Sequence, residues 1–231
     1  MPAPELPRGA RPAAAVALVA LLLAAPPSPA AGRDGPPRTL AGVLDAHCRA
    51  REATTTLRAR FVQTKGFTAI GEEDRSSGVL YYRKPDRLRW EYSAPDRAWT
   101  VIAGDRGWAV FPRIRQVQRF TVGRSRAEGI LSTIGFGACG AALADAFETT
   151  LAFGAGGAPV LSLTPRGPEL AASFTRVELT LDPKDHLPRD ILLHETSGDT
   201  TRFVLSDVQR GVAIEGSLFL FTAPEGYSVV P

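Results

Sequence analysis

Residues 78–92 read Gly78-Val-Leu-Tyr-Tyr-Arg-Lys-Pro-Asp-Arg-Leu-Arg-Trp-Glu-Tyr92. Four large aromatic side chains lie in these fifteen positions, on either side of a Lys-Pro-Asp-Arg sequence that is typical of a tight turn. After the turn, Leu88, Trp90 and Tyr92 alternate with charged residues. A period of two predicts a β-strand with one apolar and one wet face. The stretch therefore predicts an antiparallel hairpin that turns large aromatic rings to one side.

The same period recurs along most of the chain. After Thr39, apolar residues at helical spacing predict a short amphipathic helix. Residues 125–146 show no alternation and contain many small residues, which predicts one or two short helices. Turn residues separate about eleven predicted strands. These strands are expected near residues 58–66, 76–84, 88–93, 98–103, 107–112, 116–122, 147–153, 159–164, 174–181, 188–195 and 200–208.

The number of strands limits the architecture. One antiparallel sheet of about eleven strands twists too strongly to stay flat. We therefore expect a mostly β fold, in which the sheet forms an incomplete, half-open antiparallel β-barrel with a helical lid. A barrel much wider than eight strands encloses a space that its own side chains do not fill. The aromatic residues either line such an apolar cavity or fill the barrel core, and both interpretations fit the sequence.

Residues 1–31 have the pattern of a signal peptide. Arg8 and Arg11 precede an apolar run at residues 13–25, and Ser28-Pro-Ala30 supplies small residues for cleavage. The run is too short for a comfortable membrane span, although an uncleaved anchor is the alternative. We therefore expect export to the periplasm, with a cleaved signal peptide.

The rest of the chain shows no domain boundary. Residues 32–38 form the expected flexible lead-in, and residues 39–231 form one expected domain. Removing Glu5, Arg8 and Arg11 lowers the formal charge from +3 to +2, which argues against nucleic acid as a partner. A local group of basic residues forms either a solvated strand face or a contact for anionic headgroups. This group comprises Arg83, Lys84, Arg87, Arg89, Arg113 and Arg115.

Few residues suggest chemistry. The sequence lacks the Gly-x-Ser-x-Gly, His-Glu-x-x-His and Cys-x-x-Cys motifs. His186 and His194 could approach each other and Asp190 across a hairpin, but such surface groups are usually solvated. We therefore expect no metal, no cofactor and no enzymatic activity. In an exported protein Cys48 and Cys139 could form a disulfide, or could stay two small buried thiols.

Several short segments occur in an order that is more specific than any one of them alone. They are Phe61-Val-Gln63, Ser76-Ser-Gly-Val-Leu-Tyr-Tyr-Arg-Lys-Pro85, Leu88-Arg-Trp-Glu-Tyr-Ser-Ala-Pro95, Gly104-Asp-Arg-Gly-Trp108, Gln116-Val117 and Leu218-Phe-Leu-Phe-Thr-Ala-Pro-Glu-Gly-Tyr-Ser-Val229. Together these segments span nearly the whole mature chain. They resemble the LolA family, the periplasmic carriers of outer-membrane lipoproteins.

The resemblance implies an incomplete antiparallel barrel with a helical lid, in agreement with the strand count. It also implies a shuttle that takes acylated lipoproteins from an ATP-driven exporter in the inner membrane to an acceptor at the outer membrane, and we expect a monomer. Each buried CH₂ is worth ~0.8 kcal/mol, so exposing three acyl chains to water costs on the order of tens of kcal/mol. The alternatives on the same fold are a carrier of a glycolipid or another envelope lipid, and a lipid-sensing regulatory protein.

The resemblance also implies roles for particular residues. Leu88 and Trp90 occupy positions that line the hydrophobic cavity in the family. Leu80, Tyr82 and Val101 should face the same way by strand period. The candidate lining is therefore Leu80, Tyr82, Leu88, Trp90, Tyr92 and Val101.

The expected lid lies in the interval without alternation. Ile130, Leu131 and Ile134 are the candidates for its inner face. In the family, Arg often stands immediately before the turn proline, where it controls closure of the lid. Here Lys84 takes that position, so Lys84 is the candidate latch, with Arg83 as the alternative.

Overall fold

The computed structural model describes residues 37–122 and 139–231. Its helices are α1 (Leu40–Glu52), α3 (Ala141–Ala146) and α4 (Pro168–Ala171), with short 3-10 helices η1 (Pro112–Ile114), η3 (Ala155–Gly157) and η4 (Gly216–Phe219). Its strands are β1 (Thr56–Phe67), β2 (Glu72–Arg83), β3 (Arg87–Ala94), β4 (Ala98–Ala103), β5 (Arg106–Phe111), β6 (Gln116–Thr121), β7 (Phe147–Phe153), β8 (Pro159–Pro165), β9 (Phe174–Leu181), β10 (Pro188–Glu195), β11 (Thr200–Arg210) and β12 (Ser228–Val230).

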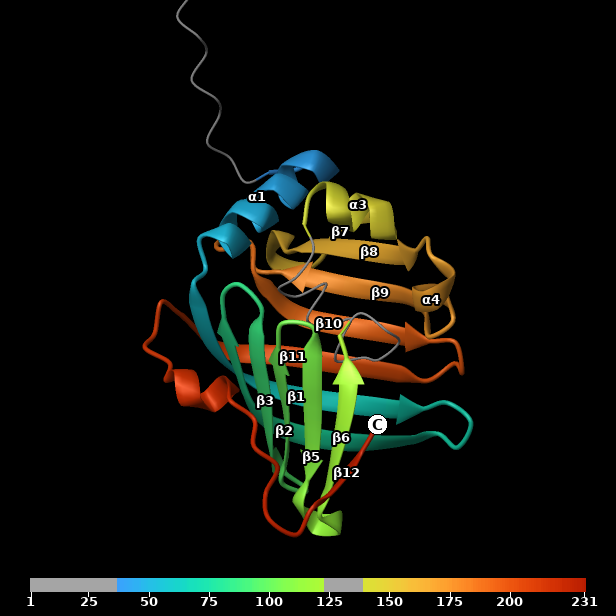
Figure 1. Cartoon of the computed structure of the whole chain (residues 1–231). Helices are drawn as coiled ribbons and strands as arrows, with labels where there is room; N and C mark the ends of the chain where they lie inside the picture. The colour runs from blue at the N-terminus through green and yellow to red at the C-terminus, as the bar shows by residue number, and fades with distance from the viewer. Residues whose placement is uncertain (1–36, 123–138) are drawn as a thin grey trace, which may run out of the picture. The chain divides into compact units, whose positions relative to one another are not determined.

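All strands of the described residues join one sheet, in the order β12-β6-β5-β4-β3-β2-β1-β11-β10-β9-β8-β7 (Figure 1). Within the described ranges no ladder joins β7 to β12, so the sheet is open. The eleven predicted strands and the half-open antiparallel architecture are therefore confirmed. Strand β12, which pairs in parallel with β6, was not predicted, because its three residues are too few to show alternation.

Strand β1 joins two halves of the sheet. Its residues pair with β2 along one side and with β11 along the other. Hairpins connect β2 to β6 and β7 to β11 in sequence order, so each half assembles from local contacts. Figure 1 shows β5 and β6 running across the direction of β9 and β10, because the sheet bends strongly between its halves.

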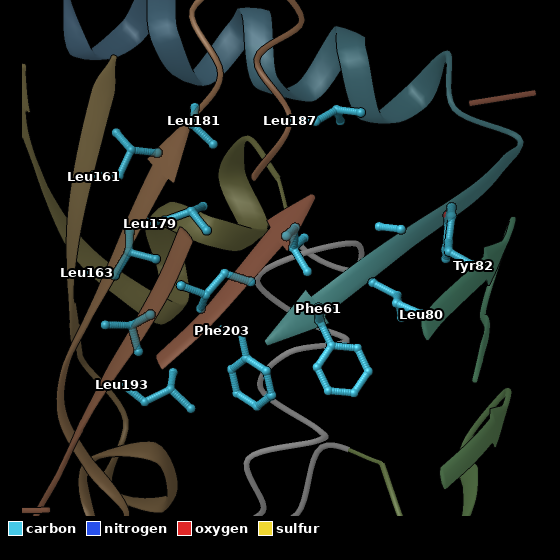
Figure 2. Close-up of a cluster of buried hydrophobic side chains, with 14 of the residues drawn as sticks. Phe61, Leu80, Tyr82, Leu161, Leu163, Leu179, Leu181, Leu187, Leu193 and Phe203 are labelled. Atoms are coloured by element: carbon cyan, nitrogen blue, oxygen red, sulfur yellow. The ribbon is translucent and has the colours of Figure 1, made fainter. Parts of the chain in front are cut away.

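One face of the sheet, called here the inner face, holds the main hydrophobic core. Its buried side chains come from both halves, among them Phe61 of β1, Leu80 of β2 and Phe203 of β11 (Figure 2). Leu161, Leu163, Leu179, Leu181, Leu187 and Leu193 extend this core across β8 to β10. Alternating burial along strands such as β8 and β9 produces this face, as a period of two requires.

Helix α1 covers one end of the inner face. Thr39 begins the helix as its N-cap, since its side-chain oxygen accepts a hydrogen bond from the Gly42 amide at 3.2 Å. Val43 is fully buried in the core, and the His47 ring bonds through Nδ1 to the backbone oxygen of His186 at 2.9 Å. The helix predicted after Thr39 is thus confirmed. None of the helices in residues 37–122 and 139–231 has the length and hydropathy of a transmembrane span.

The opposite, outer face of β3 to β5 is covered by the segment that follows β11. Phe219 of η4 is buried, and the Phe221 ring stacks on Trp108 with 5.0 Å between ring centroids. The Arg89 guanidinium donates to the Leu218 carbonyl at 3.1 Å. Because of this cover, Val101 of β4 and Val110 of β5 are buried on the outer face as well.

The two cysteines meet where α1 approaches Cys139, two residues before α3 begins. Both thiols are free and half-buried, and the Cys48 side chain is hydrogen-bonded to that of Cys139. Burial and this hydrogen bond raise the pKa of Cys48 to about 12. Cys48 therefore holds its proton at neutral pH, so its thiol is a slow nucleophile. Forming a disulfide with Cys139 also requires an oxidant, such as an oxidised thiol–disulfide carrier protein.

We expect the Gly78→Ala variant to be destabilised by about 2–3 kcal/mol. A Cβ at Gly78 would lie 1.8 Å from the Glu91 carbonyl oxygen and 3.0 Å from the Phe61 ring. Urea unfolding of both proteins measures the difference. Gly154→Ala is the matched control, because its Cβ would make only ordinary contacts, the nearest at 3.5 Å. An equal effect of the two changes would contradict this explanation.

We expect protein isolated from the periplasm to contain a Cys48–Cys139 disulfide, formed by exchange with an oxidised thiol–disulfide carrier protein. The contact between the two thiols makes the bridge geometrically accessible, and it would stabilise the fold by roughly 4 kcal/mol through loop closure. Alkylation before and after reduction, read by mass spectrometry, measures it. Two thiols that alkylate without reductant would show that the bridge is absent, and Cys48→Ser provides the unbridged reference.

Candidate functional site

Four aromatic rings form the centre of the inner face. The Phe61 ring lies edge-on to Trp90 and to Tyr92, with centroids 4.8 and 5.0 Å away. Trp90 also contacts Phe203, at 5.3 Å between centroids. Because Phe61 is on β1, Trp90 on β3 and Phe203 on β11, this cluster connects the two halves of the sheet.

The register places most of the predicted lining on this face. Leu80 pairs with Trp90 across β2 and β3, and Tyr82 pairs with Leu88, so all four side chains point to the same side. All four are buried in the core. Tyr92 lies on the same face but is only half-buried, and its hydroxyl donates to the Gln63 side-chain oxygen at 2.8 Å. That these residues bind a ligand is still a prediction.

Val101 does not share this face, so that part of the prediction is wrong. In the β3–β4 ladder Val101 pairs with Arg89, whereas Trp90 pairs with Thr100 and Leu88 with Ile102. Val101 is nevertheless 0 % exposed, because the segment after β11 covers the outer face. Burial on both sides of β4 made the two faces look alike in the sequence.

Sequence reasoning also missed half of the site. The inner face includes leucines of β8 to β10 and Phe203 of β11, none of which was predicted as lining. Their alternation was visible, but it shows only which residues share a face. Contact between β1 and β11 decides that this face continues the one formed by β2 and β3.

The predicted latch contacts α1. The Lys84 ammonium group donates to the backbone oxygen of Glu52, the last residue of α1, at 2.9 Å, and the Lys84 amide donates to the Thr55 carbonyl at 2.8 Å. A cation at this position also complements the helix dipole. Arg83, the alternative, lies beside Gly216. Ile130, Leu131 and Ile134 lie outside the described residues.

Polar groups gather where α1 meets the inner face. Burial lowers the pKa of His47, so its ring is neutral at physiological pH, and burial raises the pKa of Tyr82. The Nε and Nη1 atoms of Arg51 are buried there without a hydrogen-bond partner, as is Nε1 of Trp90 further along the face. The site thus combines a wide apolar surface with a few unpaired N–H groups.

The histidines and the carboxylate considered for a metal do not converge. Asp190 accepts hydrogen bonds from Arg202 at 3.0 Å, and His194 lies 3.1 Å from a Glu178 oxygen. The backbone of His186 instead bonds to His47. Within residues 37–122 and 139–231, no three His, Cys, Asp or Glu side chains form a metal-binding group.

Comparison with known sequences gives consistent results. The family model described as outer membrane lipoprotein carrier protein LolA matches residues 52–222. An outer-membrane lipoprotein carrier protein from Alkalilimnicola ehrlichii is 30% identical over 176 residues, which cover 76% of this chain and 78% of that protein. A protein of the same name from Dechloromonas aromatica is 28% identical over 193 residues, covering 82% and 88%.

Comparison with solved structures supports the fold. An uncharacterised conserved protein from Thermus thermophilus superposes with a TM-score of 0.51 at 17% identity, covering 84% of this chain and 99% of that one. The match of the family model extends from the end of α1 to beyond η4, and so includes every strand of the inner face. The chain therefore belongs to the LolA family of outer membrane lipoprotein carrier proteins.

Proposed function

We propose that this protein is a periplasmic carrier that binds the acyl chains of lipoproteins against its inner face and shuttles them from the inner to the outer membrane. Residues 1–31 are then a cleaved signal peptide, residues 32–38 a flexible lead-in and residues 39–231 the carrier domain. The observation on which the proposal rests is the continuous apolar inner face of an open sheet, in a member of the LolA family.

The inner face suits acyl chains for a physical reason. Acyl chains offer only apolar area, so a large non-directional surface binds them without demanding one register. Aromatic and leucine side chains supply that area with few rotamers. The open edges β7 and β12 leave the sheet free to change curvature, unlike a closed barrel. The same surface can therefore bind chains and later release them.

The proposed role requires partners but no covalent chemistry. Lipoprotein would come from an ATP-driven exporter in the inner membrane and leave to an acceptor at the outer membrane. The carrier contributes binding and transfer, so we do not propose that it is an enzyme. A monomer with one inner face is sufficient for this cycle.

Native mass spectrometry of the protein purified gently from its own periplasm tests the proposal. We expect bound masses that correspond to a mixture of acylated polypeptides. A single small lipid mass would instead support a carrier of a glycolipid or another envelope lipid on the same fold. A protein that never carries acyl chains would refute both.

We expect Tyr92→Ser to weaken binding of a synthetic triacylated lipopeptide by about tenfold, because it removes a half-buried ring from the inner face. Tyr81→Ser is the matched control: Tyr81 is also half-buried, but it pairs with Arg89 on the outer face. Titration calorimetry gives the affinities, and urea unfolding gives the stability of each variant. Equal losses of affinity in the two variants would exclude the inner face as the site.

We propose that Lys84 governs discharge, since its ammonium group fastens the end of α1 to the turn that follows β2. Lys84→Leu is expected to load lipopeptide normally but to pass it more slowly to acceptor vesicles, whereas Lys84→Arg keeps the donors and should transfer at nearly the normal rate. Fluorescence transfer from a labelled lipopeptide measures both steps. Unchanged transfer by Lys84→Leu would show that Lys84 is no latch.

A further inference from the structure

The most unusual feature beside the inner face is Arg51, a cation with two solvent-shielded guanidinium nitrogens that have no hydrogen-bond partner among the described residues. Arg51 extends from the last turn of α1, and its Nε and Nη1 atoms are shielded from solvent although the residue as a whole is half-buried. No hydrogen bond or ion pair reaches them within the described ranges. Arg60, by contrast, is well exposed and is paired with Asp207 at 3.1 Å.

The guanidinium group of Arg51 lies close enough to His47 and Tyr82 for its charge to act on both side chains. Burial is the main cause of the shifted pKa values of His47 and Tyr82, and the Arg51 charge acts on both groups. His47 lies one turn earlier on α1, and Tyr82 is a buried residue of the inner face on β2. The charge therefore lies at the α1 end of the proposed acyl-binding surface.

A second unpaired donor lies further along the same face. The indole Nε1 of Trp90 is buried without a hydrogen-bond partner among the described residues. A buried indole N–H usually finds an acceptor, and an unsatisfied buried donor costs about 1–3 kcal/mol, more when it is charged. The unpaired nitrogen of His47, Nε2, is an acceptor in the tautomer that donates from Nδ1 to His186, so it does not compete for acceptors.

Unpaired donors in an apolar site indicate the kind of ligand that completes it. A fully apolar ligand would leave three donor nitrogens, Nε and Nη1 of Arg51 and Nε1 of Trp90, buried and unpaired. An acyl lipid offers carbonyl, ester or carboxylate oxygens at one end, and these oxygens are acceptors. A planar guanidinium group suits such oxygens because its N–H bonds form a fixed fork.

We infer that Arg51 and Trp90 form a polar anchor that donates hydrogen bonds to the acceptor oxygens at the head of an acyl-chain ligand. This inference rests on the proposed acyl-binding function and adds that the inner face recognises the head as well as the chain. Arg51 places the oxygen-bearing end at the α1 side of the inner face, and Trp90 contributes its N–H further along the same face. The chain then lies along the leucine and phenylalanine side chains of the sheet.

Three amphiphiles with the same chain test the inference: dodecanoate, glycerol monododecanoate and dodecyltrimethylammonium. The first has an anionic head, the second a neutral ester, and the third a cationic head without an acceptor. Displacement of the neutral dye Nile red from delipidated protein gives each affinity. The variants are Arg51→Met, Trp90→Phe and the outer control Arg60→Met.

We expect Arg51→Met to weaken binding of dodecanoate and of the monoester by about five- to tenfold, and not to weaken binding of the ammonium probe. Trp90→Phe, which keeps the ring but loses the N–H, should give a smaller loss for the same two probes. A loss confined to dodecanoate would support the anchor and show that it binds an anionic head, not a neutral ester. Arg60→Met should leave all three affinities within about twofold.

Two other outcomes would overturn the anchor. In the first, wild-type protein binds all three probes, and Arg51→Met weakens binding of all three equally or of none. The proposed carrier function would then stand without the anchor. Wild-type protein that binds no probe would refute the carrier function itself. Thermal unfolding gives an independent test. Without ligand, Arg51→Met should melt no lower than wild type, because the change removes two shielded donors that have no partner. If Arg51 were structural, its loss would lower the melting temperature.

Discussion

The contact of Phe61 with Trp90 and Phe203 holds the two halves of the sheet together. Each ring belongs to a strand separated from the others by many residues, and β1 is the only strand of the described sheet that pairs with both halves. Gly78 makes the contact possible, since a side chain there would collide with the Glu91 backbone beside the Phe61 ring. With this join in place, apolar residues of two separate hairpin series become one surface.

An open sheet has two faces to bury, and different segments of the chain cover them. The outer face of β3 to β5 is closed by its own chain, through Phe219, the Trp108–Phe221 stack and the bond from Arg89 to Leu218. The inner face meets a helix at one end, and α1 is held there by His47 and Lys84. In the proposed function the permanently covered face provides stability, while the inner face exchanges cover for cargo.

A carrier of this kind must bind firmly and still release its cargo. Apolar area alone increases affinity with chain length, at ~0.8 kcal/mol for each buried CH₂, and does not distinguish one end of a ligand from the other. A charged donor such as Arg51 adds direction, because its interaction depends on where the oxygens lie. When the ligand is released, water can replace the hydrogen bonds of this donor. Apolar contacts have no such replacement.

The strands, the helix after Thr39, the open mostly β architecture and the family could all be predicted from the sequence, because alternation and turn residues are local properties of the chain. The sequence also placed Leu80, Tyr82, Leu88 and Trp90 together, since a single hairpin defines their register. The remaining features depend on how distant segments pack in the folded chain. Val101 points outward because the β3–β4 register sets its face, and its burial comes from residues more than one hundred positions later. The far half of the inner face and the isolation of Arg51 likewise depend on contacts between segments distant in sequence, which no local period records.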